Sequence, residues 1–173
     1  MDLLPDASMP VAVIVERRAV DNPWITHSWT VVEVLPGNPA AAPWTAIAEG
    51  PGWTRYLAGV APLEMHKRET ETYKYNVEGE TPSVYVFLRR EDGEPGLVLL
   101  GATVCVGEAE AHSDAGDDIL EAVPMPPVVQ AWVAAFVAEH HVERAFYKRK
   151  RDRADPEALA RGGRRRFEDL DGE

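Results

Sequence analysis

The stretch Ser83-Val-Tyr-Val-Phe-Leu-Arg-Arg90, together with the loop Glu91-Asp-Gly-Glu-Pro-Gly96 behind it, decides the fold class. β-Branched and aromatic residues in such a short run are typical of a strand, and a short glycine-containing loop is typical of a hairpin. The apolar run from Leu97 to Val106 then predicts a returning strand that is covered on both faces. Neighbouring strands are therefore expected to pair antiparallel.

Upstream of this hairpin the chain repeats the same pattern of short strands and turns. β-Branched runs separated by clusters of proline, glycine and asparagine predict strands over residues 11–18, 29–35 and 44–48. The runs 53–60 and 63–68 are predicted to pair as a hairpin that turns at Ala61-Pro62. The result is a series of strands joined mainly by turns.

The segments around and after the hairpin are less uniform. Residues 69–80 favour a strand by their Thr, Tyr and Val content and a short helix by their spacing, and both interpretations stay open. Residues 107–121 carry six acids and no Lys or Arg, which predicts a solvated connection. A helix is predicted after Pro124-Met-Pro-Pro127, because proline suits a first helical turn. Its apolar stripe is able to cover one face of a sheet, and consists of Val128, Val129, Trp132, Val133, Phe136 and Val137.

Strands followed by a helix predict an α+β fold. We expect an antiparallel sheet of six or seven strands, which could be rolled into a barrel, packed against one C-terminal helix. A length of 173 residues suits one domain. The expected organisation is a flexible leader over 1–9, a single globular domain over 10–147 and a flexible basic and acidic tail over 148–173.

The charge is unevenly distributed, and this limits the classes of partner. Residues 1–142 contain 8 Lys/Arg and 21 Asp/Glu, a net charge of −13, whereas residues 144–166 contain 10 Lys/Arg and 3 Asp/Glu, a net charge of +7. An acidic body argues against nucleic-acid binding, because phosphate contacts need a basic surface. No run approaches the roughly 18–20 apolar residues of a membrane span, and no secretory signal is recognisable. With a single cysteine, the predicted location is the cytoplasm.

The tail carries the strongest prediction of a binding site. Two aromatic residues precede four consecutive cations: Phe146, Tyr147, Lys148, Arg149, Lys150 and Arg151. One interpretation is a solubilising, self-repelling end. A second is an arm that binds a protein partner with an acidic surface and orders as it binds. A third is weak RNA binding, which the acidic body disfavours because it would repel a polyanion.

No catalytic or metal-binding motif is recognisable, so the chain is predicted not to be an enzyme and to hold no cofactor or metal. It has no glycine-rich phosphate loop, serine elbow, zinc cysteine pair or calcium loop. His140 and His141 are adjacent, so on a helix they point about 100° apart and cannot easily bind one metal from the same face. His27, His66 and His112 lie in separate segments. Cys105 lies in an apolar run, where a buried and inert thiol is expected.

The five tryptophans allow two interpretations. Trp24, Trp29, Trp44 and Trp53 fall at predicted strand starts or turns, and Trp132 lies on the predicted helix. Core packing accounts for most of them, but two or three at one sheet end would also form a recognition surface. An alternative function is a small-molecule or molybdopterin-type cofactor-binding domain. The expected lining of its pocket is Trp24, Trp53, Arg55 and Arg89.

Several short blocks resemble a known family. They are Met9 to Arg18 with Asp21-Asn22-Pro23-Trp24, Tyr75-Asn76, Ser83 to Arg89, Val123-Pro-Met-Pro126 with Trp132, and His140-His-Val142 leading to Phe146 and Lys148 to Arg151. They are similar to the bacterial domain-of-unknown-function family thirty-three-oh-five. Val106-Gly-Glu-Ala109 departs from the Ser-Pro-Tyr-Glu-Ala type of stretch expected there.

This resemblance implies an accessory role, since members of the family accompany molybdenum-dependent formate dehydrogenases and their maturation proteins in gene neighbourhoods. It implies no catalytic residues. The functional hypothesis is therefore a non-enzymatic accessory or adaptor protein that binds another protein, with a molybdenum- or iron–sulfur-containing formate dehydrogenase as the expected partner.

Overall fold

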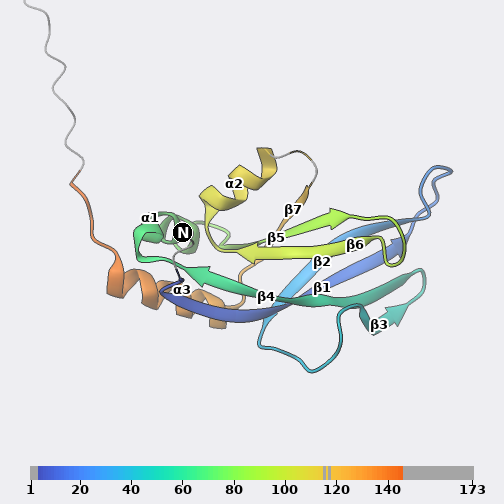
Figure 1. The fold of residues 1–173 in the computed structure, drawn as a ribbon, viewed down its shortest axis with the longest axis horizontal. Helices are drawn as coiled ribbons and strands as arrows, with labels where there is room; N and C mark the ends of the chain where they lie inside the picture. The colour runs from blue at the N-terminus through green and yellow to red at the C-terminus, as the bar shows by residue number, and fades with distance from the viewer. Residues whose placement is uncertain (1–3, 115, 117, 146–173) are drawn as a thin grey trace, which may run out of the picture. The chain divides into compact units, whose positions relative to one another are not determined.

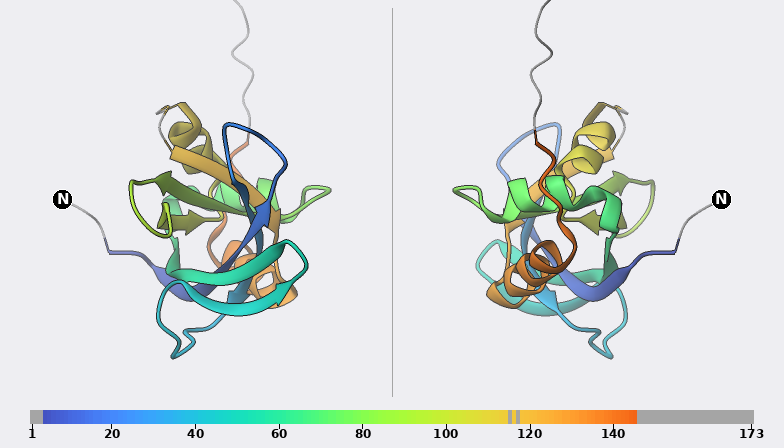
Figure 2. Two further views of the ribbon diagram at one scale, coloured as in Figure 1. Left: turned by 90° about the vertical axis from the view of Figure 1, so that its right-hand side faces the viewer. Right: turned by 90° about the vertical axis from the view of Figure 1, so that its left-hand side faces the viewer.

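The computed structural model describes residues 4–114, 116 and 118–145. The chain divides into two compact units, Met1–Val142 and Glu143–Glu173. Every helix and strand described below belongs to the first unit. Seven strands form two antiparallel sheets in this part of the chain, and three α-helices accompany them. Figures 1 and 2 show their arrangement.

The larger sheet has four strands in the order β2-β1-β4-β3. They are β1 (Ala7–Ala19), β2 (His27–Pro36), β3 (Thr45–Gly50) and β4 (Trp53–Met65). β1 occupies the interior of this sheet because its β-branched run from Val11 to Val15 is buried on both faces. Val11, Val13 and Val15 enter the main core, whereas Ala12 and Ile14 join Leu57 in a small cluster on the other face.

The smaller sheet has the order β6-β5-β7 and contains the predicted hairpin. β5 (Ser83–Arg90) pairs antiparallel with β6 (Leu97–Thr103) and with β7 (Asp118–Pro124). The backbone N–H of Glu91 donates to the carbonyl of Gly96 and closes the loop between β5 and β6 (3.1 Å). The predicted hairpin is therefore confirmed, although the returning strand predicted over Leu97 to Val106 ends at Thr103.

The prediction of one sheet is corrected to two, and the described strands do not close into a barrel. β4 lies beside β6 and β2 lies beside β7, so the two sheets meet along two seams. At the second seam a side chain replaces a ladder bond: the backbone N–H of Val31 donates to Glu121 Oε2 (2.6 Å). The main core fills the space between the sheets.

The runs 53–60 and 63–68 were predicted to form a hairpin, and the turn between them was wrong. β4 runs straight through Ala61-Pro62, and Pro62 lies opposite Pro10 in the register with β1. The backbone N–H of Gly37 donates to the carbonyl of Pro10, so Pro10 faces β2 and forms no ladder bond with Pro62. The nitrogen of Pro62 then faces away from β1, toward the side of β4 where β3 pairs. β3 pairs only with residues 53–57 of β4, so it does not reach Pro62. Neither proline therefore removes a hydrogen bond between β1 and β4.

One C-terminal helix was predicted, and the described residues form three α-helices. α3 (Pro127–His140) begins at the predicted prolines and buries Val129, Val133, Phe136 and Val137, although Val128 is 60% exposed. α1 (Thr70–Val77) follows the short 3₁₀ helix η1 (Lys67–Glu69) and lies against α3 at one end of the first unit (Figure 1). α2 (Val106–Asp114) covers the outer face of the smaller sheet.

The acidic segment 107–121 is therefore not a simple solvated connection, because it contributes most of α2 and the first four residues of β7. Its charges have structural partners. Asp118 Oδ1 accepts a hydrogen bond from Arg89 Nε (2.9 Å), and Glu108 Oε2 accepts one from the Thr103 hydroxyl (2.7 Å). Thr103 Oγ1 in turn accepts from the backbone N–H of Cys105, at the start of α2 (3.0 Å). The acidic composition of this segment therefore led to the wrong prediction of a loop where the structure has a helix and the start of a strand.

Candidate functional site

Four side chains form what we call the aromatic–arginine cluster: Arg17, Trp29, Trp44 and Tyr56. The ring centroids of Trp29 and Trp44 lie 5.7 Å apart in an edge-on arrangement, and Tyr56 lies 5.8 Å from Trp29 and 6.3 Å from Trp44. The Arg17 guanidinium carbon lies 5.4 Å from the centroid of the Tyr56 ring and 5.9 Å from that of Trp29. These distances are typical of cation–π contacts.

Strand register brings this cluster together from four separate segments. Arg17 follows Val11, Val13 and Val15 on one face of β1, because side chains alternate along a strand. Trp29 lies opposite Arg17 on β2, and Tyr56 lies opposite Val15 on β4. Trp44 arrives from the loop before β3. The cluster therefore extends the core face of the larger sheet to its hairpin end.

The backbone at Trp44 is strained. Its φ is +66°, in the left-handed region that bulky residues rarely adopt. The N–H of Thr45 donates to the carbonyl of Ala42 (3.2 Å), so residues 42–45 form a β-turn with Pro43 and Trp44 at its centre. A positive φ at the third position is the requirement of a type II turn, which glycine meets without strain. The Trp44 N–H donates to the carbonyl of Leu57, which holds this conformation.

All four side chains of the aromatic–arginine cluster are half-buried rather than enclosed. The three rings pack against the main core on one side. Their other surfaces remain accessible, as does part of the Arg17 side chain. A strained backbone that holds a half-exposed tryptophan is a feature that core packing alone does not require.

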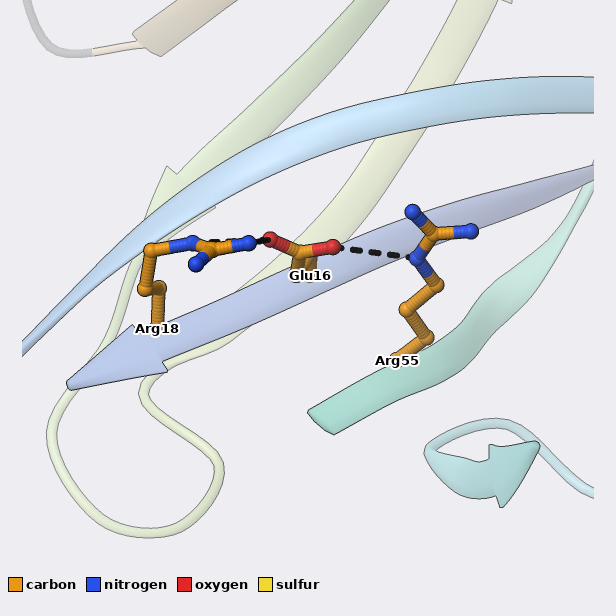
Figure 3. A network of polar contacts seen from close by, with 3 residues as sticks. All are labelled: Glu16, Arg18 and Arg55. Atoms are coloured by element: carbon orange, nitrogen blue, oxygen red, sulfur yellow. Dashed lines mark hydrogen bonds and ion pairs between the residues drawn. The ribbon is translucent and has the colours of Figure 1, made fainter. Parts of the chain in front are cut away.

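The opposite face of the same strands carries an ion-pair network, drawn in Figure 3. Glu16 Oε2 accepts from Arg55 Nε (3.0 Å), and Glu16 Oε1 accepts from Arg18 Nη2 (2.7 Å). The hydrogen bonds from Arg55 and Arg18 hold the pKa of the Glu16 carboxyl below its usual value of 4.5. Because β1 exposes Arg17 on one face and Arg18 on the other, cations flank the hairpin end on both faces of the sheet.

Trp53 continues this second face at the turn between β3 and β4. The Arg55 guanidinium carbon lies 5.3 Å from the centroid of the Trp53 ring. A Cβ atom on Gly50 would lie 2.5 Å from that ring, so only glycine allows it to pack there. A hollow of about 320 Å³ opens beside it. Its lining includes Arg17, so the hollow adjoins the aromatic–arginine cluster; the other lining residues are Ala19, His27, Glu49, Gly50, Gly52, Trp53 and Thr54.

Further large apolar side chains are exposed near the hairpin turns. Trp24 is 89% exposed in the loop between β1 and β2, and Ile25 beside it is 48% exposed. The Trp24 N–H donates to Asn22 Oδ1 (2.8 Å), so the predicted turn at Asp21-Asn22-Pro23 has a side-chain hydrogen bond. Ile47 of β3 is 50% exposed. All three belong to connections or strands that meet at the end of the sheet remote from α1 and α3 (Figure 1).

The four residues expected to line a pocket are only partly brought together. Trp53 and Arg55 are in contact, whereas Trp24 extends into solvent. Arg89 belongs to the other sheet, where it binds Asp118. The interpretation of the tryptophans as a shared surface fits Trp29 and Trp44, which touch each other. Sequence reasoning did not single out Arg17 and Tyr56, which join them only through the strand register.

The two adjacent histidines bind different neighbours. The His140 ring lies 4.6 Å from Phe136 at its centroid, and His141 Nδ1 lies 3.1 Å from Thr70 Oγ1. His112 stacks on Phe87 with a centroid distance of 4.0 Å. In the described part of the chain, no group of three or more His, Cys, Asp or Glu residues could hold a metal ion.

Cys105 is buried, as expected, but it precedes α2 instead of lying in a strand. The tail residues proposed to bind a partner lie outside the described residues: Phe146, Tyr147, Lys148, Arg149, Lys150 and Arg151. None of the helices in the described residues is long and apolar enough to cross a membrane.

Comparison with known proteins identifies a family without an assigned activity. A family described as "Protein of unknown function (DUF3305)" matches residues 10–150 of this chain. Neither the curated proteins nor the solved structures include a match.

Proposed function

This chain belongs to the family described as protein of unknown function (DUF3305), and we propose that it is a non-enzymatic accessory protein that binds another protein through the aromatic–arginine cluster. The match covers the sheets, the helices and the start of the basic tail. It supplies no activity, so the proposal rests on the site itself.

The observation that supports this proposal is the half-exposed Trp29–Trp44 pair with Tyr56 and Arg17. Trp, Tyr and Arg are the residue types that dominate the binding energy of protein interfaces. Their side chains offer large contact areas with few rotatable bonds, or several hydrogen-bond donors, at one place. The contacts with Trp29 and Tyr56 hold the Trp44 ring before any partner arrives, so little conformational entropy is lost on binding.

Charge favours a partner that presents carboxylates to this end of the sheet. Arg17, Arg18 and Arg55 are three of the eight Lys and Arg residues in residues 1–142, and all three lie on the hairpin half of β1 and β4. Arg17 is held by the rings of Trp29 and Tyr56, so its donors remain available to a carboxylate. The sequence of the tail residues 146–151, with four consecutive cations, favours the same class of acidic partner.

The family resemblance makes a molybdenum-dependent formate dehydrogenase the first partner to test. Binding of the purified enzyme to this protein can be measured by biolayer interferometry with the full chain immobilised. Trp44→Gly removes the ring and suits the positive φ, so the variant keeps the turn. We expect it to weaken binding by about tenfold or more, as removal of an interface hot spot does.

Two further variants separate the site from general effects. Tyr75→Ala removes an aromatic side chain that is 75% exposed on α1, far from the cluster, and should leave binding unchanged. A chain that ends at Tyr147 tests the tail. If Trp44→Gly binds as tightly as the unchanged protein, the aromatic–arginine cluster is not the interface.

A further inference from the structure

A second hollow, which we call the β4–β6 cleft, lies on the other half of the first unit. Its volume is about 620 Å³, within the usual range for small-molecule sites. It is bounded by the last part of β4, by β6, by α2 and by η1 with the start of α1. Its lining residues are Pro62, Glu64, His66, Arg68, Glu69, Tyr73, Phe87, Leu100, Gly101, Ala102, Thr103, Cys105, Gly107, Glu108 and His112.

The sheet geometry explains why this cleft exists. Leu63 and Met65 of β4 are fully buried in the core, so Pro62 and Glu64 face outward by strand alternation. On β6, Gly101 lies opposite Phe87 of β5, on the outer face that α2 covers. A side chain at Gly101 would occupy the floor of the cleft, and a Cβ atom there would meet only Phe87, at 3.8 Å. The missing side chain therefore leaves open space between α2 and β4.

Carboxylates dominate the charge of the β4–β6 cleft. Glu64, Glu69 and Glu108 line it, against one guanidinium, that of Arg68. Arg68 Nε lies 3.5 Å from Glu69 Oε1, so this cation is already paired. Glu108 accepts a hydrogen bond from the Thr103 hydroxyl, a neutral donor that does not offset the charge of a carboxylate. With neutral histidines the lining carries a net charge of about −2.

One end of the cleft also holds a buried hydrogen-bond donor. The Tyr73 hydroxyl accepts from the backbone N–H of His66 (3.0 Å), and Tyr73 is 1% exposed. Burial raises the pKa of Tyr73 to about 12, so the phenol keeps its proton. The Tyr73 hydroxyl thus accepts one hydrogen bond and keeps a hydrogen of its own, and Tyr73 lines the cleft. A molecule in the cleft that carries an acceptor can take this hydrogen bond.

The neighbouring thiol is satisfied within the protein. Cys105 Sγ lies 3.3 Å from Thr72 Oγ1, and the Thr72 hydroxyl donates its own hydrogen to the carbonyl of Glu69 (3.1 Å). The thiol is therefore the donor of the pair. Its hydrogen is turned toward α1, and the apolar wall of the cleft is completed by Phe87, Leu100 and Ala102.

We propose that the β4–β6 cleft binds a small organic cation: an amine joined to an apolar body that also carries a hydrogen-bond acceptor. The amine pairs with Glu64 and Glu108, the apolar body covers Leu100 and Phe87, and the acceptor takes the proton of Tyr73. An anion would have to overcome the net negative lining. This site is separate from the aromatic–arginine cluster and does not depend on the proposed function.

Phenylalaninamide is a suitable probe, since it has an amine, an apolar ring and an amide acceptor. Its binding can be followed by chemical-shift perturbation in two-dimensional NMR spectra of the full chain. N-Acetylphenylalanine, which replaces the amine by a neutral amide and carries a carboxylate, is the charge-reversed control. We expect saturable, millimolar binding of phenylalaninamide with shifts at Gly101, Gly107 and Glu64, and no saturation with the control.

Three variants test the location and the charge. Glu64→Gln should weaken binding about threefold, as loss of one partly exposed ion pair does. Glu33→Gln removes the same charge from an exposed position on β2, outside the cleft, and should leave affinity unchanged. Gly101→Val fills the floor and should abolish binding while the thermal midpoint shows that the protein still folds. Equal binding of both probes, or full binding by Gly101→Val, would overturn the proposal.

Discussion

An aromatic cluster lies at each end of the first unit, and the two clusters differ in what surrounds them. At the helical end, Tyr73 and Phe136 pack edge to face with a centroid distance of 6.1 Å, and both are buried. At the hairpin end, Trp29, Trp44 and Tyr56 pack at similar distances but stay half-exposed. Similar ring contacts therefore serve in an enclosed core and on an accessible surface.

Backbone and polar groups explain the difference. Beside Tyr73, the buried Asn76 side chain donates to the carbonyls of Ser83 and Val104 and accepts from the N–H of Ser83. These bonds join α1 to β5 and to the segment after β6, so the helical end is held by packing and polar contacts together. At the hairpin end the backbone of Trp44 is strained instead. The cluster at the helical end is explained by its contribution to the stability of the fold. The cluster at the hairpin end retains backbone strain at Trp44, which a binding role would explain.

The largest expected effect is the loss of the Tyr73 ring. Tyr73→Ala should lower the free energy of unfolding by about 4 kcal/mol, because it leaves a cavity against Phe136 and an unpaired His66 N–H. Tyr73→Phe keeps the packing and loses the hydroxyl, so it should cost about 1 kcal/mol. Urea unfolding measures both. Equal losses in the two variants would mean that packing at the helical end contributes little.

Asn76→Ala should come next, at about 3 kcal/mol, because it removes the side-chain partner of one buried and two part-buried backbone groups. The adjacent Tyr75 is 75% exposed, so Tyr75→Ala is a matched control with an expected loss below about 0.5 kcal/mol. Both are measured by the same urea titrations. Were Asn76→Ala as stable as Tyr75→Ala, the junction of α1 with β5 would not support the helical end.

Local signals in the sequence predicted the elements that local physics decides. The strand at Ser83–Arg90, its hairpin loop and the helix after Pro124-Met-Pro-Pro127 follow from β-branched runs, turn residues and proline placement. α2 was missed because its start does not match the usual capping motif. The N–H of Cys105 donates to the Thr103 hydroxyl, which in turn donates to Glu108. β4 was divided because a proline normally ends a strand, and only the long-range partner Pro10 shows why Pro62 does not.

The sequence allowed a cluster of tryptophans at a sheet end to be predicted, but not which other residues join it. Clustering of two tryptophans at a sheet end was one of the interpretations that the sequence allowed, and Trp29 with Trp44 fulfils it. Arg17 and Tyr56 join through pairings between β1, β2 and β4, and bulges shift two of those registers by one residue. A shift of one residue moves a side chain to the other face, so sequence spacing alone cannot assign these positions.

A pair of substitutions at Trp44 separates strain from ring packing. Trp44→Ala and Trp44→Gly both remove the ring, but only glycine adopts a φ of +66° without cost. The glycine variant should therefore be more stable than the alanine variant by about 1 kcal/mol, in reverse of the usual preference for alanine. Thermal and urea unfolding give the difference. A more stable alanine variant would show that the turn relaxes and stores no strain.

The smallest expected effect concerns the ion-pair network behind the aromatic–arginine cluster, and it depends on pH. The pKa of Glu16 is lowered in the folded protein by hydrogen bonds from Arg55 and Arg18. A lowered carboxyl pKa stabilises the fold above the unfolded-state pKa, and this contribution is lost as the pH falls through the folded-state pKa. The stabilisation from Glu16 should therefore be complete at neutral pH, begin to fall near the usual pKa of 4.5 and be lost as the pH drops through the lowered pKa of the folded state.

Glu16→Gln tests this sign against Glu33→Gln, which removes an equal charge from an exposed site on the neighbouring strand. Both variants relieve the repulsion of an acidic body, so their difference isolates the Arg18 and Arg55 contacts. At neutral pH the thermal midpoint of Glu16→Gln should lie below that of Glu33→Gln. The gap should begin to close as the pH falls below 4.5, the usual pKa of this carboxyl, and vanish once the pH is below the lowered pKa of the folded state. A gap that is constant with pH would assign the loss to packing of the side chain, and the hairpin end would then gain nothing from its charges.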